Sequence, residues 1–292
     1  MVAHDAGAAR LLQSWMAPLG PQLCFCLEGP ALSLFEAERG TLDRINLQEG
    51  LQDCQLLISG SGWSSTMEHD SRCLAAALGI PSIAVLDHWV NYLPRFQRRG
   101  ETMLPDGLWV ADAEAAALAR RILPGIPITQ LPNRWLEMLK SSVQRERQHL
   151  GRTGGITPAK NLLYLLEPLR DQNSGLPNGE EFAALDYWIS KLPGLIASGL
   201  VAEREQLQLR LRPHPSEAPG KYNTWIKQQP DQWPVILDKN HGLDQSLAEA
   251  DLTFGCETQA LVAAMACDLK AFSTLPPSAP PCRLPHKQLQ NL

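Results

Sequence analysis

Apolar residues follow two alternating patterns along the chain. Short, mostly apolar runs such as residues 82–86 (SIAVL) and 161–166 (NLLYLL) are typical of buried β-strands. Between such runs, apolar residues recur every three or four positions. In residues 180–196 this helical face comprises Phe182, Leu185, Trp188, Ile189 and Leu192. Strands that alternate with helices predict a parallel sheet with helices on both faces.

This alternation occurs twice, on either side of a polar stretch. In the first half, the predicted elements cover residues 22–27, 53–59, 66–78, 82–86, 107–111 and 113–122. In the second half, they cover residues 161–166, 180–196, 206–211, 221–228, 234–237, 243–250, 252–254, 257–267 and 269–273. Residues 141–160 lack apolar periodicity, which is typical of a linker. We therefore expect an α/β fold with an N-terminal domain at residues 1–140 and a C-terminal domain at residues 161–292. The proline-rich end after Ser273 predicts an extended tail.

The composition is that of an ordinary globular protein. Of the 292 residues, 44% are hydrophobic and 20% are charged, and the net charge of -5 gives no general attraction to nucleic acid or anionic membranes. No apolar run approaches the roughly 20 residues of a membrane span, and the N-terminus does not have the pattern of a signal peptide. The seven cysteines are odd in number and scattered. We therefore expect reduced thiols, no metal site, no cofactor and a cytoplasmic protein.

Three polar motifs follow predicted strands, the places where ligands bind in open parallel sheets. The first is Arg212-Pro213-His214-Pro215, in which each proline extends the backbone of the residue before it. A rigidly held imidazole loses little entropy when it binds a phosphate oxygen, and it can stabilise a departing phosphate. In the alternative interpretation, His214 caps the next helix and the prolines only form the turn. The residues leave both interpretations open.

The second motif, Gly255-Cys256-Glu257-Thr258, lies between a predicted strand and a predicted helix. Gly255 permits a tight turn, the first amides of the helix are donors, and Thr258 adds a hydroxyl. These groups suit an anion, whereas the Glu257 carboxylate repels phosphate and suits sugar hydroxyls better. In the alternative interpretation this is an ordinary helix start, in which the helix dipole stabilises the acid.

The third motif combines two strand ends of the first half. Gly60, Ser61 and Gly62 would let a ligand approach the backbone closely, and Asp87-His88-Trp89 offers polar groups and an aromatic face to a sugar. Alternatively, Trp89 is a core residue and Asp87 a helix cap. Near the N-terminus, a His-Asp pair at residues 4–5 precedes a glycine. It could supply a general base, or it could be part of a frayed chain end.

The motifs of the second half resemble those of bacterial glycosyltransferases with the GT-B architecture, in which two Rossmann-like domains face each other across a cleft. The similarity covers residues 206–275, and sialyltransferases, polysialyltransferases and capsule or teichoic-acid transferases carry a comparable His-Pro motif. It implies that His214 binds the donor phosphate with Thr258 as a hydroxyl partner. The chain departs from the sialyltransferase pattern, because Cys256 and Glu257 precede a single threonine where paired Ser or Thr is usual. The stretch at residues 255–258 is closer in style to that of sugar-nucleotide 2-epimerases.

The sequence therefore predicts a metal-independent glycosyltransferase that moves a sugar from a nucleotide donor to a hydroxyl of a surface polysaccharide or glycolipid. The expected catalytic residues are Asp5, Asp87, His88 and His214. The expected donor-binding residues are Arg212, His214, Pro215, Gly255, Cys256, Glu257 and Thr258. The expected acceptor-binding residues are Gly60, Ser61, Gly62 and Trp89. We expect no nucleic-acid partner and leave peripheral membrane association open. Two alternatives remain: an epimerase or hydrolase on the same fold, and a non-catalytic nucleotide-sugar-binding protein.

Overall fold

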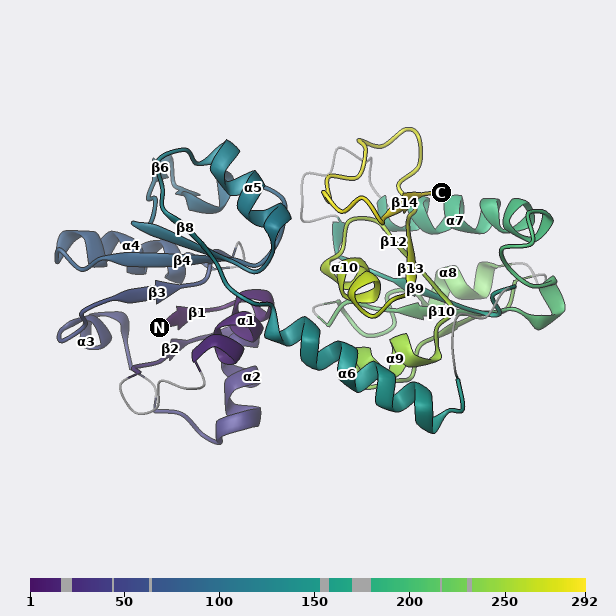
Figure 1. Cartoon of the computed structure of the whole chain (residues 1–292), viewed down its shortest axis with the longest axis horizontal. Coiled ribbons are helices and arrows are strands. Elements are labelled where there is room, and N and C mark those ends of the chain that lie inside the picture. The colour runs from purple at the N-terminus through teal and green to yellow at the C-terminus, as the bar shows by residue number, and fades with distance from the viewer. Residues whose placement is uncertain are drawn as a thin grey trace. The chain divides into compact units, whose positions relative to one another are not determined.

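A computed structural model describes residues 1–16, 23–43, 45–62, 65–152, 158–169, 180–215, 217–229 and 233–292 (Figure 1). The chain divides into two compact units, Met1–Trp135 and Leu136–Leu292. Each unit has its own parallel sheet and its own core. The domains were predicted to meet at residues 141–160; the change of unit falls a few residues earlier, after Trp135.

The first unit is built on a parallel sheet with the strand order β2-β1-β3-β4-β7-β8. Its strands are β1 (Val2–Ala3), β2 (Cys26–Leu27), β3 (Leu57–Ser59), β4 (Ser82–Leu86), β7 (Gly107–Val110) and β8 (Ile128–Gln130). Its helices are α1 (Ala6–Met16), α2 (Gly29–Arg39), α3 (Leu47–Leu51), α4 (Met67–Ala77) and α5 (Ala113–Ile122). A short hairpin of β5 (Gln97–Arg98) and β6 (Glu101–Thr102) lies outside this sheet.

Alternating side chains of these strands divide the first core between the two faces of the sheet. Ala3 and Ile58 pack in one cluster with residues of α1 and α2, whereas their neighbours Val2 and Leu57 pack in another with residues of α3 and α4. This alternation is the period of two that a strand imposes on its side chains. Helices therefore cover both faces, as predicted.

The second unit repeats this architecture, with the strand order β11-β10-β9-β12-β13-β14. Its strands are β9 (Asn161–Leu165), β10 (Gln208–Arg212), β11 (Val235–Leu237), β12 (Leu252–Gly255), β13 (Lys270–Ser273) and β14 (Gln290–Asn291), and all are parallel. Its helices are α7 (Glu180–Ala197), α8 (Asn223–Gln228), α9 (Leu243–Glu249) and α10 (Gln259–Ala266). Helix α6 (Arg134–His149) begins at the boundary between the units and contacts α9 through a hydrogen bond from Arg147 to the Ala248 carbonyl.

An aromatic cluster forms the core on one face of the second sheet. Trp188 of α7 is fully buried, with its ring 5.0 Å from that of Tyr164 and 5.4 Å from that of Phe254. Burial of a side chain of this size stabilises the fold by about 2–3 kcal/mol. Trp225 of α8 belongs to the same cluster. Arg210 alternates with the core residues along β10 and bonds to α9, so α9 covers the opposite face.

Most of the strands and helices predicted from the apolar pattern are confirmed to within one to three residues. The strand at residues 82–86 and the helix at residues 113–122 have the predicted bounds, and Asp112 caps that helix by accepting a hydrogen bond from the Ala115 amide at 2.6 Å. The strand predicted at residues 53–59 is confirmed only from Leu57 onward. The strand predicted at residues 22–27 is observed only as Cys26–Leu27, and its first residue lies outside the described residues.

Two segments differ from the sequence-based expectation. Residues 141–149, in the predicted linker, continue helix α6, whose interior positions Leu139 and Val143 are buried; residues 153–157 of that linker lie outside the described residues. The extended tail after Ser273 returns to the second sheet as β14, which pairs with β13, and Tyr187 donates a hydrogen bond to the Leu292 carbonyl at 2.7 Å.

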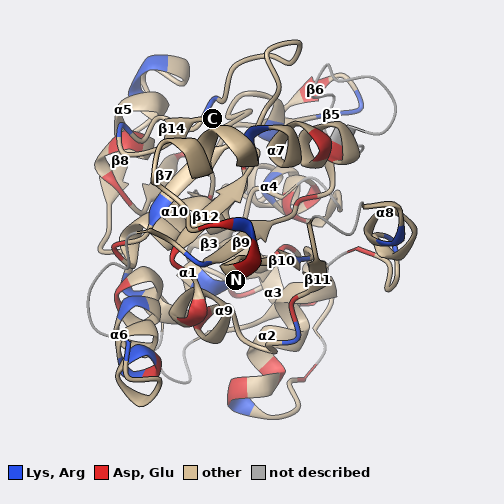
Figure 2. Cartoon of the chain, turned by 90° about the vertical axis from the view of Figure 1, so that its right-hand side faces the viewer, with Lys and Arg blue, Asp and Glu red and all other residues tan. Residues whose placement is uncertain are grey.

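Charged residues of both signs are mixed over the helices of both units. Figure 2 shows Lys and Arg alternating with Asp and Glu, for example along α6. This mixture is consistent with the absence of a global electrostatic attraction to polyanions. Within the described residues, no helix is both long enough and apolar enough to cross a membrane.

Candidate functional site

The carboxyl ends of three adjacent strands bring the predicted catalytic residues of the first unit together. β1 ends before His4 and Asp5, β3 before Gly60, and β4 before Asp87, and β3 lies between β1 and β4 in the sheet. Because parallel strands end at the same edge, residues far apart in sequence become neighbours there. We call His4, Asp5, Glu68 and Asp87 the acid cluster.

His4 and Asp5 form a hydrogen-bonded pair. His4 Nδ1 lies 2.8 Å from Asp5 Oδ1, and both side chains are partly exposed. The His4 carbonyl accepts a hydrogen bond from the Ala31 amide at 2.9 Å, which fixes the residue against α2. A carboxylate on Nδ1 selects the tautomer in which Nε2 keeps its lone pair. The pair therefore has the arrangement of a general base with an orienting acid.

Glu68, the first-turn acid of α4, is buried at the centre of the acid cluster. Its Oε1 accepts from the His4 amide at 3.1 Å, and its Oε2 accepts from the Gly62 amide at 2.7 Å. Burial raises the pKa of this carboxyl, whereas the two amide hydrogen bonds lower it. Nothing in the local sequence pattern indicated Glu68, because it lies in an ordinary helical stretch and its partners are remote in the chain.

Glycines leave the space that these carboxylates occupy. A Cβ atom on Gly60 would lie 2.3 Å from Glu68 Oε1, one on Gly62 would lie 2.1 Å from Asp5 Oδ2, and one on Gly7 would lie 2.0 Å from Asp87 Oδ2. Non-bonded Cβ contacts this short essentially never occur, so a side chain at any of these positions would have to displace the carboxylate. The glycines of the predicted acceptor loop therefore have a defined physical role, which is to admit acid side chains against the backbone. The Ser61 hydroxyl between them is buried and donates to the Val85 carbonyl at 2.7 Å.

Asp87 is held by a buried arginine. Arg95 Nη1 lies 3.0 Å from Asp87 Oδ1 and also donates to the Ser61 carbonyl at 3.1 Å. Burial raises the pKa of Asp87, the Arg95 cation opposes that rise, and the nearby Asp5 carboxylate adds to it.

The other two predicted residues of this edge, His88 and Trp89, have hydrogen-bond partners outside the acid cluster. His88 Nδ1 accepts from the Trp89 amide at 2.9 Å. Trp89 is buried, and its indole Nε1 donates to both carboxylate oxygens of Asp112 at 3.1 and 2.9 Å. Trp89 thus occupies the core position that the sequence left open as an alternative. Base catalysis by His88 and acceptor binding by Trp89 stay predictions.

In the second unit, the two predicted donor motifs begin at the same level of the sheet. Arg212 at the end of β10 and Gly255 at the end of β12 are both paired with Leu165 of β9, which lies between them. Two strand spacings separate the motifs, about 10 Å. His214 and Thr258 therefore belong to loops that leave one edge of the sheet on either side of β9.

The turn that carries His214 is braced by Glu217. The His214 amide donates to Glu217 Oε2 at 2.9 Å, and Glu217 Oε1 accepts from Lys221 Nζ at 2.5 Å and from the Tyr222 hydroxyl at 2.6 Å. The His214 side chain is exposed, and so is Pro215. The backbone of the turn is therefore fixed while the imidazole lies at the surface, as a binding residue requires. Sequence reasoning did not identify Glu217.

The start of α10 shows why its first residues are small or polar. A Cβ atom on Gly255 would lie 2.8 Å from the Leu165 carbonyl oxygen. Thr258 caps the helix, with its hydroxyl accepting from the Ala260 amide at 3.2 Å. Cys256 is buried, with its sulfur 3.6 Å from the Tyr164 hydroxyl, and burial raises the pKa of its thiol. Donor binding by these residues stays a prediction.

Two glutamates and an arginine occupy the space beside this helix start. The Glu257 amide donates to Glu167 Oε1, and Arg283 of the C-terminal segment binds both oxygens of the Glu257 carboxylate, at 2.7 Å through Nη2 and 2.7 Å through its amide. Glu167 is buried just past the end of β9. Burial raises its pKa to about 8, with the Glu257 charge adding to the rise. A carboxyl group of the chain itself thus accepts a hydrogen bond from one of the amides that were predicted to bind a ligand anion.

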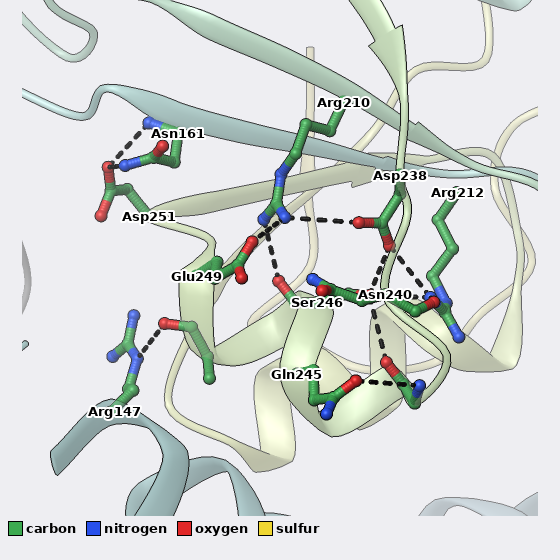
Figure 3. Close-up of polar contacts among 12 residues, drawn as sticks. Arg147, Asn161, Arg210, Arg212, Asp238, Asn240, Gln245, Ser246, Glu249 and Asp251 are labelled. Atoms are coloured by element: carbon green, nitrogen blue, oxygen red, sulfur yellow. Dashed lines mark hydrogen bonds and ion pairs between the residues drawn. The ribbon is translucent and has the colours of Figure 1, made fainter. Parts of the chain in front are cut away.

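Arg212 reaches the loop that connects β11 to α9. Its guanidinium donates to Asp238 Oδ2 at 2.9 Å, the Asn240 carbonyl at 2.9 Å, Ser246 Oγ at 2.8 Å and the His241 carbonyl at 3.1 Å (Figure 3). These bonds fix a loop at the carboxyl edge of the sheet. A direct role for Arg212 in donor binding stays a prediction.

Comparisons with known proteins identify the fold. No protein-family model matches the chain, and no curated protein sequence matches it. The UDP-GlcNAc 2-epimerase from Methanocaldococcus jannaschii aligns with a TM-score of 0.52 and 11% identity, over 93% of this chain and 82% of that one. MnaA from S. aureus, in a structure with UDP, aligns with a TM-score of 0.58 and 11% identity, over 94% of this chain and 78% of that one.

The wall teichoic acid polymerase TagF also aligns, with a lower TM-score of 0.48 and 10% identity, over 94% of this chain and 69% of that one. Together with the two parallel sheets, the similarity to the M. jannaschii and S. aureus structures shows a GT-B-like α/β fold with two Rossmann-like domains. This confirms the fold class that the sequence predicted. At such low identity the comparisons define the fold alone, and fold does not define function.

Proposed function

We propose that the protein is a glycosyltransferase that uses a nucleotide-activated sugar and transfers the sugar to a hydroxyl group. The observation that carries the proposal is the His4–Asp5 pair, which lies within the acid cluster at the carboxyl edge of the first sheet. An acceptor hydroxyl needs a base to become a nucleophile, and an imidazole with an oriented Nδ1 is suited to that task.

In this mechanism, His4 Nε2 takes the proton of the acceptor hydroxyl, and Asp5 stabilises the imidazolium that forms. The hydroxyl oxygen then bonds to the anomeric carbon of the donor as the bond from that carbon to the phosphate oxygen breaks. Asp5, predicted as a base, thereby becomes the residue that orients the base. Asp87 and its partner Arg95 hold the neighbouring loop in place.

The second unit is proposed to hold the donor nucleotide. His214 on its braced turn and Thr258 at the start of α10 would contact the phosphates, and His214 would stabilise the negative charge on the departing nucleotide. The proposal needs no metal ion, because an imidazole and helix amides supply the positive potential. The acceptor is proposed to be a surface polysaccharide or a glycolipid.

A sugar-nucleotide 2-epimerase is the second candidate, and one observation favours it. The solved structures with the higher TM-scores reported above are of UDP-GlcNAc 2-epimerases or of MnaA with UDP. An epimerase must remove a proton from one face of a sugar carbon and return one to the other face. The acid cluster could serve that chemistry as well, since it combines an imidazole with carboxyl groups of raised pKa.

One experiment separates the two reactions. The purified chain is incubated in D2O with UDP-, CDP-, GDP- and CMP-sugars, with and without alkyl glycosides as acceptors. A transferase releases the nucleotide only when an acceptor is present. A 2-epimerase forms a second sugar nucleotide without acceptor and places deuterium on the sugar carbon, and that result would replace the transferase proposal. If no sugar nucleotide is bound or consumed, both candidates are wrong.

A further inference from the structure

The loop that carries the proposed base is held by a side chain of helix α4. The loops after β1 and β3 leave the regular sheet, so their backbone amides need other partners. Both oxygens of the Glu68 carboxylate meet this need: Oε1 accepts from the His4 amide at 3.1 Å, and Oε2 accepts from the Gly62 amide at 2.7 Å. One side chain therefore joins the loop of His4 to the loop that follows β3.

A second residue of α4 supports the same backbone. Arg72 lies four positions after Glu68, so the two side chains lie on one face of the helix. Arg72 Nη1 donates to the Ser59 hydroxyl at 2.9 Å and to the Gly60 carbonyl at 3.0 Å. Glu68 and Arg72 are each only 1% exposed. Together they bind two amides and one carbonyl of the two loops, so α4 fixes both loops against the sheet.

The space around Glu68 leaves its carboxylate little freedom. A Cβ atom on Gly60 would lie 2.3 Å from Oε1, and one on Gly62 would lie 3.0 Å from Oε2. The carboxylate therefore lies directly against the backbone of the loop that it binds. A side chain of another length would not reach both amides from the same helix position. This fit indicates that the shape of Glu68 matters as well as its charge.

We propose that Glu68 is a positioning residue for the transfer reaction, because it fixes the loop of His4 relative to the loop after β3 that was predicted to bind the acceptor. This inference rests on the proposed function, since it takes His4 as the base. Proton abstraction requires His4 Nε2 within hydrogen-bond distance of the acceptor hydroxyl. A displacement of about 1 Å at a reacting group can reduce a rate about 10²-fold. Glu68 acts through His4 and is not proposed to contact the substrate.

Glu68→Gln tests this contact with little change in shape. Glutamine has one acceptor oxygen and one NH2 group, so it can accept from only one of the two amides. Amide-proton NMR of the full chain gives a readout that needs no activity: the signal of His4 or of Gly62 should move upfield, and that amide should exchange with D2O at least tenfold faster. Unchanged shifts and unchanged exchange at both amides would overturn the proposal.

The kinetic effect of Glu68→Gln should fall on kcat alone. With alkyl glycosides as acceptors, kcat should decrease about 10–100-fold, because the base is displaced from the hydroxyl. The KM values of the nucleotide sugar and of the acceptor should stay within threefold of their original values, because Glu68 binds neither. A raised KM with an unchanged kcat would show that Glu68 contributes to substrate binding and would overturn its positioning role.

Asp70 provides the matched control. It is the other acid in the first turn of α4, and its carboxylate accepts from the Thr66 hydroxyl at 2.7 Å. Asp70→Asn removes the same charge from the same end of the helix, so any loss that arises through the helix dipole should appear in both variants. Asp70→Asn should keep kcat within twofold and leave the exchange of the His4 amide unchanged. Equal losses of kcat in the two variants would mean that Glu68 acts only through the stability of α4.

Gly60→Ala changes the same contact without altering Glu68, and it replaces Glu68→Gln if that variant fails to fold by circular dichroism. The added methyl group would lie 2.3 Å from Glu68 Oε1, so the end of this flexible side chain must move away from the His4 amide. Exchange of that amide should become at least tenfold faster, and kcat should fall while the acceptor KM stays unchanged. A raised acceptor KM with unchanged kcat and unchanged exchange would show that Gly60 contacts the acceptor and that Glu68 does not position the base.

The exchange and transfer measurements separate failure of this inference from failure of the proposed function. If the unmodified chain transfers sugar and Glu68→Gln keeps its kcat, the transferase proposal stands and the positioning role is wrong. If the unmodified chain transfers no sugar but Glu68→Gln still loses protection of a loop amide, the transferase proposal is wrong and Glu68 still fixes the loop of His4. If both are correct, kcat and amide protection decrease together.

Discussion

The carboxyl edges of the two sheets occupy equivalent places in the fold and use charge in different ways. In the first unit, Glu68 and Asp87 lie against glycines and are held by backbone amides and Arg95, so burial leaves the pKa of each carboxyl raised. In the second unit, Asp238 lies between two arginines and fixes a loop (Figure 3). The first edge therefore holds carboxyl groups that bind a proton more readily than ordinary acids do, whereas the second edge uses ion pairs to fix a loop.

One acid of the second edge, Glu167, does not follow this difference. Glu167, at the edge of the second sheet, resembles the acids of the first, because it is buried and its pKa is raised to about 8. No arginine bonds to Glu167 directly in the hydrogen bonds described above, since Arg283 bonds to Glu257 instead. Glu167 accepts from a backbone amide, as Glu68 does. The difference therefore lies between these acids and Asp238, which pairs with two arginines.

The largest effect is expected from the proposed base. His4→Asn should reduce kcat by about 10²–10⁴-fold, the usual contribution of a general base, because the asparagine cannot take a proton from the acceptor. The nucleotide-sugar KM should stay within threefold of the original value. Initial rates over a range of donor concentrations, with saturating acceptor, measure both quantities.

His149→Asn is the control for this prediction, because His149 is an exposed histidine at the end of α6 and has no place in the acid cluster. It should keep full activity. Loss of activity in His4→Asn together with a lowered melting temperature would indicate a structural role for His4 instead. Asp5→Asn should show an intermediate loss, since it removes the orienting charge and keeps the imidazole.

The second largest effect, on stability, is expected at Asp238 and the two arginines that pair with it, Arg210 and Arg212. Asp238→Ala should lower the free energy of unfolding by about 3–5 kcal/mol, because Arg210 would lose a buried charge partner. Arg210 and Asp238 are both buried, and Asp238 contacts Arg210 at 3.3 Å and Arg212 at 2.9 Å. Urea unfolding followed by circular dichroism measures the change.

Glu205→Ala is the matched control, since Glu205 forms a pair with Arg204 at 3.8 Å on the surface, where both side chains are exposed. Exposed pairs contribute about 0–1 kcal/mol, so this variant should unfold almost as the unmodified chain does. A similar loss for both variants would mean that the network around Asp238 is no more important than a surface contact.

The sequence could predict those elements and residues that depend on local pattern. Strands such as residues 82–86 and the helix at residues 113–122 follow from local apolar period and capping, and both have the predicted bounds. The strand ends therefore placed Gly60 and Asp87 at one edge in advance. Local pattern could not place Glu68, because its role depends on the amides of His4 and Gly62, 64 and 6 residues away.

The second unit shows the same limit at longer range. Arg283 was part of an expected extended tail, and its contact with Glu257 spans 26 residues and depends on the pairing of β14 with β13. A strand of two residues in a proline-rich segment carries no apolar period. Glu257 was suited to sugar hydroxyls by its chemistry alone, and only the fold shows that an arginine of the chain already binds it.

Glu167→Gln should change stability less than Asp238→Ala does, and in the opposite direction, because it should stabilise the chain at high pH. Because the pKa of Glu167 is raised to about 8 in the fold from an ordinary value of 4.5, the folded chain keeps a proton that the unfolded chain releases. Stability therefore falls as the pH rises from about 4.5 to 8 and is level above that range. The glutamine carries no such penalty, so at pH 9 the variant should be more stable, by an amount on the order of 2 kcal/mol.

Thermal unfolding from pH 5 to pH 9 measures this change. The gain in melting temperature should grow with pH and vanish near pH 5. Glu137→Gln, an exposed position in the first turn of α6, is the control and should show no such growth. A constant gain at every pH would show that the glutamine acts through packing and that Glu167 carries no raised pKa.

The smallest effect is expected at His214, because its imidazole is exposed and its turn is already braced by Glu217. His214→Ala removes a charge-assisted hydrogen bond to a donor phosphate, so it should weaken binding of a nucleoside diphosphate about 5–20-fold. Calorimetric titration of the variant with UDP and CDP measures this change.

His241→Ala is the matched control, since His241 is an exposed histidine that follows β11 on the same edge, and it should change affinity less than twofold. His214→Gln, which keeps a hydrogen-bond donor, should recover part of the loss. If His214→Ala binds nucleotide as tightly as the unmodified chain, the His-Pro segment is only a turn, and the second edge contributes to donor binding through α10 alone.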